Sequence, residues 1–167
     1  CEFSKAEWGI FAETDNMDIN IEGLKMLEMV NSLNLNGLNN CLKVTRFDIS
    51  ALNGIALYSF ARAELSEGYV RVIPGADVTD SVRLNLVKDA QIQNIQCVGG
   101  LNGIVFVGSN AKLRGIKTTG QAASSLLLRN MLPEEMLGSH VEFDALQIEG
   151  GTGDAVVVEE LSTFKGT

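Results

Sequence analysis

Apolar residues return at regular intervals along the first half of this sequence, in units of fourteen residues. The units are Met17–Val30, Asn31–Val44, Thr45–Tyr58 and Ser59–Val72. Five positions of the unit are apolar in nearly every copy, and the third position carries Ile19, Leu33 and Phe47 in the first three copies. The apolar positions open with a spacing of two, which is the period of a β-strand with one buried face.

The second half repeats in a longer unit of eighteen residues. Its copies are Ala90–Val107, Ala111–Leu128 and Val141–Val158, and each closes on a short apolar strand. Glycine recurs at the tenth position of the unit, and Gly- or Asn-containing pairs stand between other strands: Gly99, Gly120, Gly150, Asn39–Asn40, Asn53–Gly54, Glu67–Gly68, Asn102–Gly103 and Gly153–Asp154. These residue types tolerate the left-handed backbone of a tight corner, so we expect a corner at each place.

Each unit therefore consists of a strand, a corner and a second short strand, which cannot bury an apolar face alone. Stacking the units in parallel register places equivalent side chains about 4.8 Å apart and forms a continuous core. The sequence predicts an all-β chain folded as a parallel β-helix, or β-solenoid, of roughly seven or eight coils and about 35 Å in length.

The repeat divides the chain into two parts. Residues 1–16 lie outside it and predict an N-terminal cap, formed by a short amphipathic helix or a leading strand, with Trp8 and Phe11 as the capping residues. Residues 17–167 form the β-helix domain, with an inserted loop near residues 130–140.

Three other architectures compete with the solenoid. A coiled coil shares the fourteen-residue period, but the units are rich in Asn, Gly and β-branched residues, which disfavour helices. The stretch Leu33–Asn40 resembles a leucine-rich repeat, whose unit of 20 to 29 residues is longer than either period here. A sandwich of short strands would show the alternation without agreement between units.

Charge and composition exclude two classes of partner. The 167 residues carry 13 Lys and Arg against 21 Asp and Glu, a net charge of -8. Nucleic-acid binding needs a basic face, so we expect no nucleic-acid partner. No apolar run approaches the ~20 residues that span a bilayer, so we expect no membrane span. The 46% of hydrophobic residues is typical of a folded chain.

The three cysteines, Cys1, Cys41 and Cys97, are too few and too scattered for a disulfide framework or a Cys-x-x-Cys metal site. Cys41 and Cys97 stand among apolar residues and are expected to be small buried thiols. Cys1 in place of an initial Met fits a processed chain, a truncated chain or an acylated lipoprotein.

Two stretches carry a resemblance to a known group of proteins: Ala90–Val107, with its Asn-Gly pair between strands, and Ala111–Lys117. They resemble the right-handed parallel β-helix proteins, which include pectate-lyase-like enzymes and bacteriophage tailspikes. The likeness covers roughly residues 17–164 and is one of architecture. It implies a fold better than it implies an activity.

The enzymes of that group hold catalytic carboxylates on an outward face of adjacent coils. The polygalacturonase-like motifs Asn-Thr-Asp, Asp-Asp, Gly-His-Gly and Arg-Ile-Lys are all missing or broken in this sequence. Asp48, Glu142 and Asp144 are the acids that an enzyme would have to use, and Glu142 and Asp144 should point the same way from one strand. Asp48 and Arg62 are expected to form an ion pair between coils. His140 is the only histidine.

We therefore expect no catalytic, cofactor-binding or metal-binding residue and no cofactor. The first hypothesis is a non-enzymatic structural or adhesive β-helix, most simply a bacteriophage virion component such as a fibre, spike segment or capsid decoration. The resemblance implies self-association, with a trimer favoured, other virion proteins as partners and surface glycans as a possible ligand. The alternatives are an extracellular or virion-borne polysaccharide lyase or hydrolase, and a bacterial surface adhesin.

Overall fold

The computed structural model describes residues 2–74, 79–130 and 137–166, which form thirteen strands and, among these residues, no helix. The strands are β1 (Glu2–Ser4), β2 (Trp8–Glu13), β3 (Asp18–Asn36), β4 (Cys41–Tyr58), β5 (Arg62–Val72), β6 (Val82–Asn85), β7 (Ala90–Val98), β8 (Asn102–Val107), β9 (Asn110–Thr119), β10 (Ser124–Arg129), β11 (His140–Glu149), β12 (Asp154–Val158) and β13 (Thr163–Gly166). All pairings between neighbouring strands are parallel.

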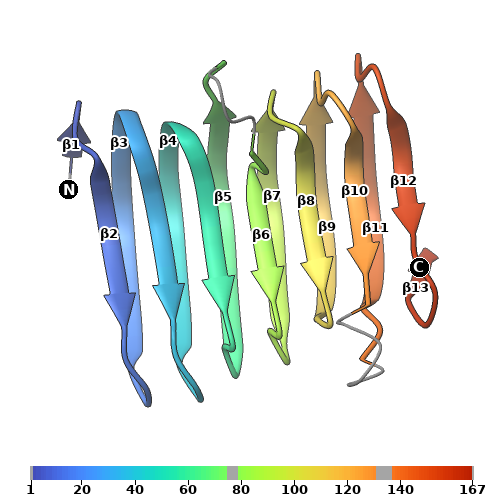
Figure 1. Ribbon diagram of the computed structural model, residues 1–167, viewed down its shortest axis with the longest axis horizontal. Coiled ribbons are helices and arrows are strands. Elements are labelled where there is room, and N and C mark those ends of the chain that lie inside the picture. Colours follow the sequence, from blue (N-terminus) through green and yellow to red (C-terminus); the bar gives the residue numbers. More distant parts are fainter. Residues whose placement is uncertain (1, 75–78, 131–136, 167) are drawn as a thin grey trace.

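The strands wind into a flattened parallel β-solenoid of about seven coils, as predicted (Figure 1). The β8 face contains β2, β6, β8, β10, β12 and the later halves of β3 and β4. The β9 face contains β1, β5, β7, β9, β11, β13 and the earlier halves of β3 and β4. The chain runs down the near face and up the far face as it advances from left to right, which is a right-handed coil.

Coil length is where the sequence prediction for the first half is wrong. Ile19 lies beside Leu42, and Leu33 lies beside Ile55, so one coil takes 23 or 22 residues there and not fourteen. Phe47 lies beside Leu24. The predicted column of Ile19, Leu33 and Phe47 is therefore not a stack.

The fourteen-residue pattern nevertheless predicts correctly that these residues lie in the interior. Leu33 and Phe47 are buried in the core, and Ile19 packs against it. A shift of fourteen carries a residue from one wall of the coil to another wall of the same apolar interior. Burial in this interior stabilises any apolar side chain, so an apolar pattern does not identify which residues are neighbours.

The eighteen-residue unit is confirmed over most of its length. Ala90, Ala111 and Val141 lie in one row, where a row denotes residues in register on successive coils. The glycines Gly99, Gly120 and Gly150 are corners with φ of 71°, 72° and 60°. The closing strands differ by one position, because Ile104 pairs with Leu126 and not with Ser125.

Two of the expected corners are wrong. Asn53–Gly54 lies inside β4 and Asn102–Gly103 lies inside β8. At both glycines a Cβ would collide with a backbone carbonyl of the following coil, that of Ser81 or Ser125. Glycine at these positions allows two successive coils to approach closely and does not form a turn.

A row of left-handed residues bends six successive coils at the same place on the β9 face. Its members are Gly23, Arg46, Glu67, Asn94, Gly115 and Ala145, with φ between 53° and 66°. The pairs before and after them stay in register on neighbouring coils, for example Glu22 with Thr45 and Leu24 with Phe47. The bend is therefore a repeated feature of the coil and lies in the middle of the strands of the β9 face, as Gly115 does in β9.

The interior is filled by apolar rows that run the length of the solenoid. One such row comprises Ala12, Leu35, Leu57, Leu84, Phe106, Leu128 and Val158. A serine ladder lines one corner of the later coils: the Ser109 backbone N–H donates to Ser139 Oγ at 3.2 Å, and the Ser139 N–H donates to Ser162 Oγ at 3.0 Å. These hydroxyls satisfy buried backbone donors where the strands end.

The first residues extend the sheet. β1 pairs with Lys25–Leu27, and β2 pairs with the end of β3, so the leading strand rather than the helix is found at Trp8–Glu13. Trp8 and Phe11 do not cap the interior: they are 46% and 54% exposed and contact each other on the β8 face. The inserted loop predicted near 130–140 lies largely outside the described residues, as does Cys1.

Candidate functional site

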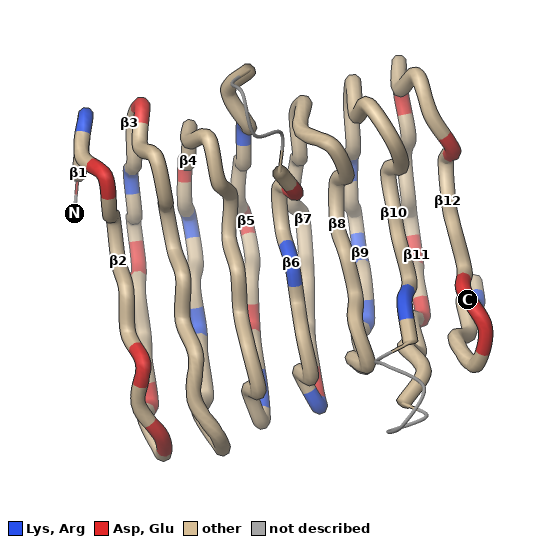
Figure 2. Tube along the Cα trace, viewed as in Figure 1, with Lys and Arg blue, Asp and Glu red and all other residues tan. Residues whose placement is uncertain are grey.

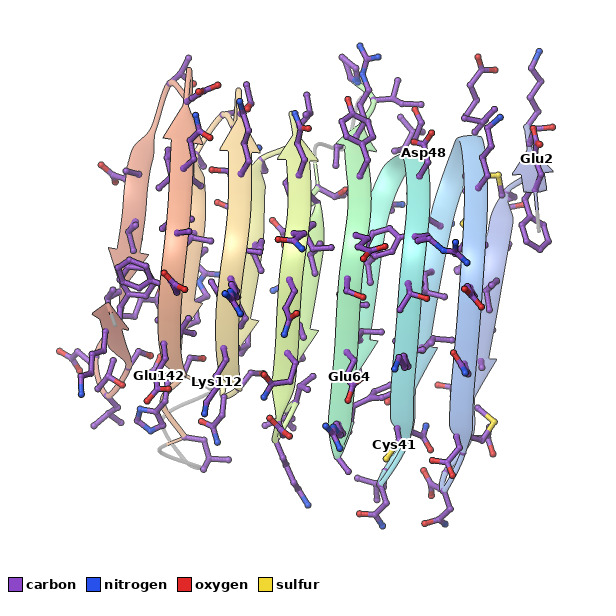
Figure 3. All side chains as sticks on the ribbon, turned by 180° about the vertical axis from the view of Figure 1, so that it is seen from behind. Glu2, Cys41, Asp48, Glu64, Lys112 and Glu142 are labelled. Atoms are coloured by element: carbon purple, nitrogen blue, oxygen red, sulfur yellow. The ribbon has the colours of Figure 1, made fainter. Side chains whose placement is uncertain are left out.

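Glu142 and Asp144 leave β11 in the same direction, as predicted, but each is matched by a cation on β9. Glu142 lies in register with Lys112, with an N–O distance of 3.8 Å (Figure 3). Asp144 lies in register with Arg114, with an N–O distance of 3.7 Å. All four side chains are more than half exposed. These carboxylates are surface charges balanced by the adjacent coil, an arrangement that holds register more than it prepares an acid for catalysis.

Asp48 and Arg62 do not form the predicted ion pair. Asp48 lies in register with Lys25 and Tyr69, whereas Arg62 lies in register with Cys41. The Arg62 guanidinium instead contacts Glu64 at 2.7 Å and Asp89 at 3.8 Å. The error follows directly from the coil length, because a shift of fourteen residues does not connect neighbouring coils.

His140 and Ser139 belong to the corner and do not form a nucleophile–base pair. The ring Nδ1 of His140 lies 2.8 Å from Thr163 Oγ1 on the outer surface. The Ser139 side chain is fully buried and its hydroxyl donates to the Arg129 carbonyl at 2.8 Å. The two side chains therefore point to opposite sides of the wall.

Cys97 is completely buried in the core, and burial raises the pKa of its thiol to about 12. Such a thiol is a poor nucleophile because the thiolate is the reactive form. Cys41 is half-buried. Across residues 2–74, 79–130 and 137–166, no three His, Cys, Asp or Glu side chains gather as metal ligands, and no helix long and apolar enough to cross a bilayer occurs.

The β8 face carries a feature that the sequence reasoning missed, a polar row that crosses the molecule. Its members are Asn31, Asn53, Asp80, Asn102, Ser124 and Asp154. The Asn53 amide donates to Asn31 Oδ1 at 2.7 Å, the Asn102 amide donates to Asp80 Oδ1 at 2.7 Å, and the Ser124 hydroxyl donates to Asn102 Oδ1 at 2.5 Å. We refer to these six residues as the polar row.

The polar row forms one edge of an open groove along the same face. The larger part of the groove, about 440 Å³, extends from Asp80 and Arg83 to Asp154 and Glu159. A second part of about 270 Å³ continues past Arg83 to Asn53 and Tyr58. Asp80 and Arg83 line both parts, so the two hollows adjoin at these residues.

The floor of the larger part is apolar. Val105, Leu127 and Val157 form an outward row on β8, β10 and β12. Val105 is 1% exposed and Leu127 is 8% exposed, although neither belongs to the main core. An apolar floor beside fixed hydrogen-bonding groups is the usual composition of a small-molecule or glycan site.

Two ion pairs hold charged side chains of the groove in place. The Asp80 side chain is 10% exposed, and its second oxygen accepts from Arg83 at 3.1 Å. Arg129 contacts Glu159 at 3.0 Å at the far end of the groove. Figure 2 shows that charged residues are few on this face and more frequent on the β9 face. The groove thus offers both hydrogen-bond donors and acceptors, with three acidic residues, Asp80, Asp154 and Glu159, against two arginines.

The residues of the groove are visible in the sequence, but only the correct coil length shows that they lie together. Asp80 and Arg83 lie in residues 73–89, which align with neither repeat unit. Val105 and Leu127 were visible as parts of apolar strands, yet only the register shows that they point outward together. Comparisons of this chain with models of protein families, with curated proteins and with solved structures gave no match.

Proposed function

We propose that this chain is a non-enzymatic structural or adhesive β-solenoid that self-associates, as a component of a bacteriophage virion such as a fibre, spike segment or capsid decoration. The observation that carries the non-enzymatic part is the pairing of Glu142 with Lys112 and of Asp144 with Arg114. Glu142 and Asp144 are each balanced by a cation and lie on the β9 face, away from the groove on the β8 face.

The architecture supports a mechanical role. Every pairing between strands is parallel and long-range, so the rod has one continuous core with hydrogen bonds directed along its axis. A thin coil has a small interior for its surface, and packing of copies side by side would bury further apolar area. We propose a trimer as the lateral assembly, with other virion proteins as further partners.

The groove supports the adhesive part of the proposal. A glycan presents hydroxyl groups to hydrogen-bonding side chains and C–H faces to an apolar floor, and the groove holds both kinds of group. Arg83 lies at the junction of the two parts of the groove and is 38% exposed, so it is available to a ligand. A surface glycan is thus the ligand class that we propose.

Enzymatic activity is tested by incubating the protein with acidic and neutral polysaccharides and measuring release of reducing ends and of unsaturated products. We expect no release. If the protein does release such products and Asp144→Asn abolishes the release, the polysaccharide lyase or hydrolase replaces this proposal. Asp80→Asn is the comparison variant, because Asp80 lies in the groove.

Glycan binding is tested on an array of bacterial surface polysaccharides. We expect Arg83→Ala to reduce binding at least tenfold, and Arg62→Ala on the β9 face to leave it unchanged. Equal loss in both variants, or no binding at all, would leave a structural role without adhesion. If an antibody against this protein labelled bacterial surfaces and not phage particles, the bacterial adhesin would be favoured.

A further inference from the structure

The β9 face differs in charge from the rest of the chain. Five of its strands, β4, β5, β7, β9 and β11, contain seven of the 13 Lys and Arg residues but only six of the 21 Asp and Glu residues. The chain as a whole has a net charge of -8. Repulsion between two copies is therefore smallest where these faces meet.

One row of this face alternates in charge about an uncharged centre. It comprises Lys43, Glu64, Gln91, Lys112 and Glu142, one residue from each of the five strands, and we call it the charged row. Glu64, Lys112 and Glu142 follow one another at the same height in Figure 3. The central strand, β7, has no charged residue at all.

The charged row is complementary to itself when its order is reversed about Gln91. The reversal places Lys43 opposite Glu142 and Glu64 opposite Lys112, while Gln91 lies opposite Gln91. A two-fold axis that runs along the strand direction produces this arrangement between two copies. Such an axis reverses the order of the coils and leaves every row facing the same row of the other copy.

We infer that two copies of this chain pack β9 face against β9 face, related by a two-fold axis that runs along β7. The inference rests on the self-association in the proposed function and specifies a surface that performs it. The contact uses none of the β8 face, so it is compatible with glycan binding in the groove.

The other rows of these five strands agree with the same axis. Tyr69 would lie opposite Lys117, a pairing of an aromatic ring with a cation. Val98 would lie opposite Val98 and give the contact an apolar group beside the axis. In the described rows of these coils, Asp89, one residue before β7, is alone in meeting a like charge, that of its own copy.

Neighbouring positions of the axis place like charges opposite each other. With the axis midway between β5 and β7, Lys43 would lie opposite Lys112. With the axis midway between β7 and β9, Glu64 would lie opposite Glu142. An axis on β5 or on β9 would place Glu64 or Lys112 opposite itself. Because like charges across an interface are costly, the charged row favours the axis on β7.

The area of the contact is close to that of a stable interface. Five coils at about 4.8 Å span about 24 Å, and the nine residues of β7 at about 3.3 Å span about 30 Å. These dimensions give roughly 700 Å² from each copy, compared with about 800 Å² from each partner in a standard interface. The face is therefore large enough to hold two copies together.

A charge swap tests the contact by sedimentation velocity. Lys43→Glu and Glu142→Lys should each weaken association at least tenfold, because each change occurs twice in the pair of copies. Combining the two changes should restore association to within about threefold of the parent chain. Lys43 and Glu142 lie four coils apart in one chain, about 19 Å, so a contact within one chain does not explain the recovery.

The matched control combines Lys43→Glu with Glu159→Lys. This double variant has the same net charge as the charge swap, but Glu159 contacts Arg129 on the β8 face. Its association should stay as weak as that of Lys43→Glu alone. Equal recovery in both double variants would overturn the contact. The Lys43 and Glu142 side chains are more than half exposed, so the fold should tolerate these changes.

Salt and the like-charged pair of Asp89 provide two further tests. Association of the parent chain should weaken as salt is added, because screening acts on the attractive pairs across the contact. Association that strengthens with salt, as repulsion through the net charge of -8 would require, would overturn the contact. Asp89→Asn should strengthen association about threefold, whereas Glu7→Gln, between β1 and β2, should not.

A crosslink locates the axis directly. In a Cys1→Ser and Cys41→Ser background, Gln91→Cys should give a covalent dimer with a short bis-maleimide. A linker is needed because packed sheets lie about 10 Å apart, beyond the reach of a disulfide. Arg129→Cys, on the β8 face, should give no dimer under the same conditions.

The outcomes separate this contact from the proposed function. Self-association that responds neither to the charge swap nor to salt, and that gives no Gln91→Cys dimer, would overturn the contact and leave the structural role intact. A chain that stays monomeric at every concentration tested would overturn both the contact and the self-association in the proposed function.

Discussion

The ring of Phe47 occupies the space that a side chain at residue 68 would need. Phe47 in β4 and Gly68 in β5 lie directly opposite each other in the parallel register. A Cβ built on Gly68 would overlap ring atoms of Phe47, which is itself 3% exposed. The two residues are therefore one packing unit, in which a large side chain on one coil requires none on the next.

Gly68→Ala should destabilise the protein by about 1–3 kcal/mol, because the added methyl group forces the buried ring to move. Urea unfolding followed by circular dichroism measures this change. Gly151→Ala is the matched control, since its Cβ would meet its nearest atom at 3.4 Å. Adding Phe47→Leu should recover part of the loss. A loss that Phe47→Leu does not reduce would contradict the steric explanation.

The left-handed row predicts opposite effects for one chemical change at two sites. Ala145 is exposed with φ of 56°, a conformation that costs a residue with a Cβ roughly 1–2 kcal/mol. Ala145→Gly should raise the free energy of unfolding by about 0.5–1 kcal/mol after the entropic cost of glycine. Ala155→Gly, in extended strand β12, should lower it by about 0.5–1 kcal/mol. If thermal unfolding showed stability changes of the same sign in Ala145→Gly and Ala155→Gly, the bend would not be strained.

Two buried serines should differ sharply in their contribution to stability. The Ser139 hydroxyl accepts from the Ser109 N–H and donates to the Arg129 carbonyl. Ser139→Ala leaves these buried groups without that partner and should cost about 1–3 kcal/mol. Ser32 is 1% exposed and its hydroxyl has no partner among the described residues. Ser32→Ala should be neutral or stabilising in the same denaturation assay.

Cys97 should make stability depend on pH in the alkaline range. Burial raises the pKa of its thiol from 9.0 to about 12, so above pH 9 the unfolded chain releases this proton while the folded chain keeps it. The contribution of this thiol to the free energy of unfolding is fully present below pH 9. It is lost as the pH rises toward 12, at up to about 1.4 kcal/mol per pH unit.

Cys97→Ala is the test of that dependence. The variant should start less stable at pH 7, because a small cavity forms, yet lose stability less steeply between pH 9 and 11 than the parent chain. Chemical denaturation at several pH values measures both slopes. Parallel curves for the two proteins would show that the buried thiol does not titrate as its environment indicates.

Local features of the sequence are sufficient to predict which residues face the interior and where the later coils turn. Alternation placed Leu33 and Phe47 in the core, and glycine marked the corners at Gly99, Gly120 and Gly150. These features are local, because a strand alternates its side chains and a left-handed turn favours glycine wherever it occurs. They were enough to predict a parallel β-solenoid.

The identity of neighbouring residues on successive coils follows from the three-dimensional structure and not from the local pattern. Backbone hydrogen bonding between whole coils fixed their length and separated Asp48 from Arg62. The same register brought Asp80 beside Asn102 and aligned Val105 with Leu127 to form the groove. Apolar burial is non-directional and accepts many offsets between strands, whereas the left-handed bends and paired edges of successive coils fit together at one offset.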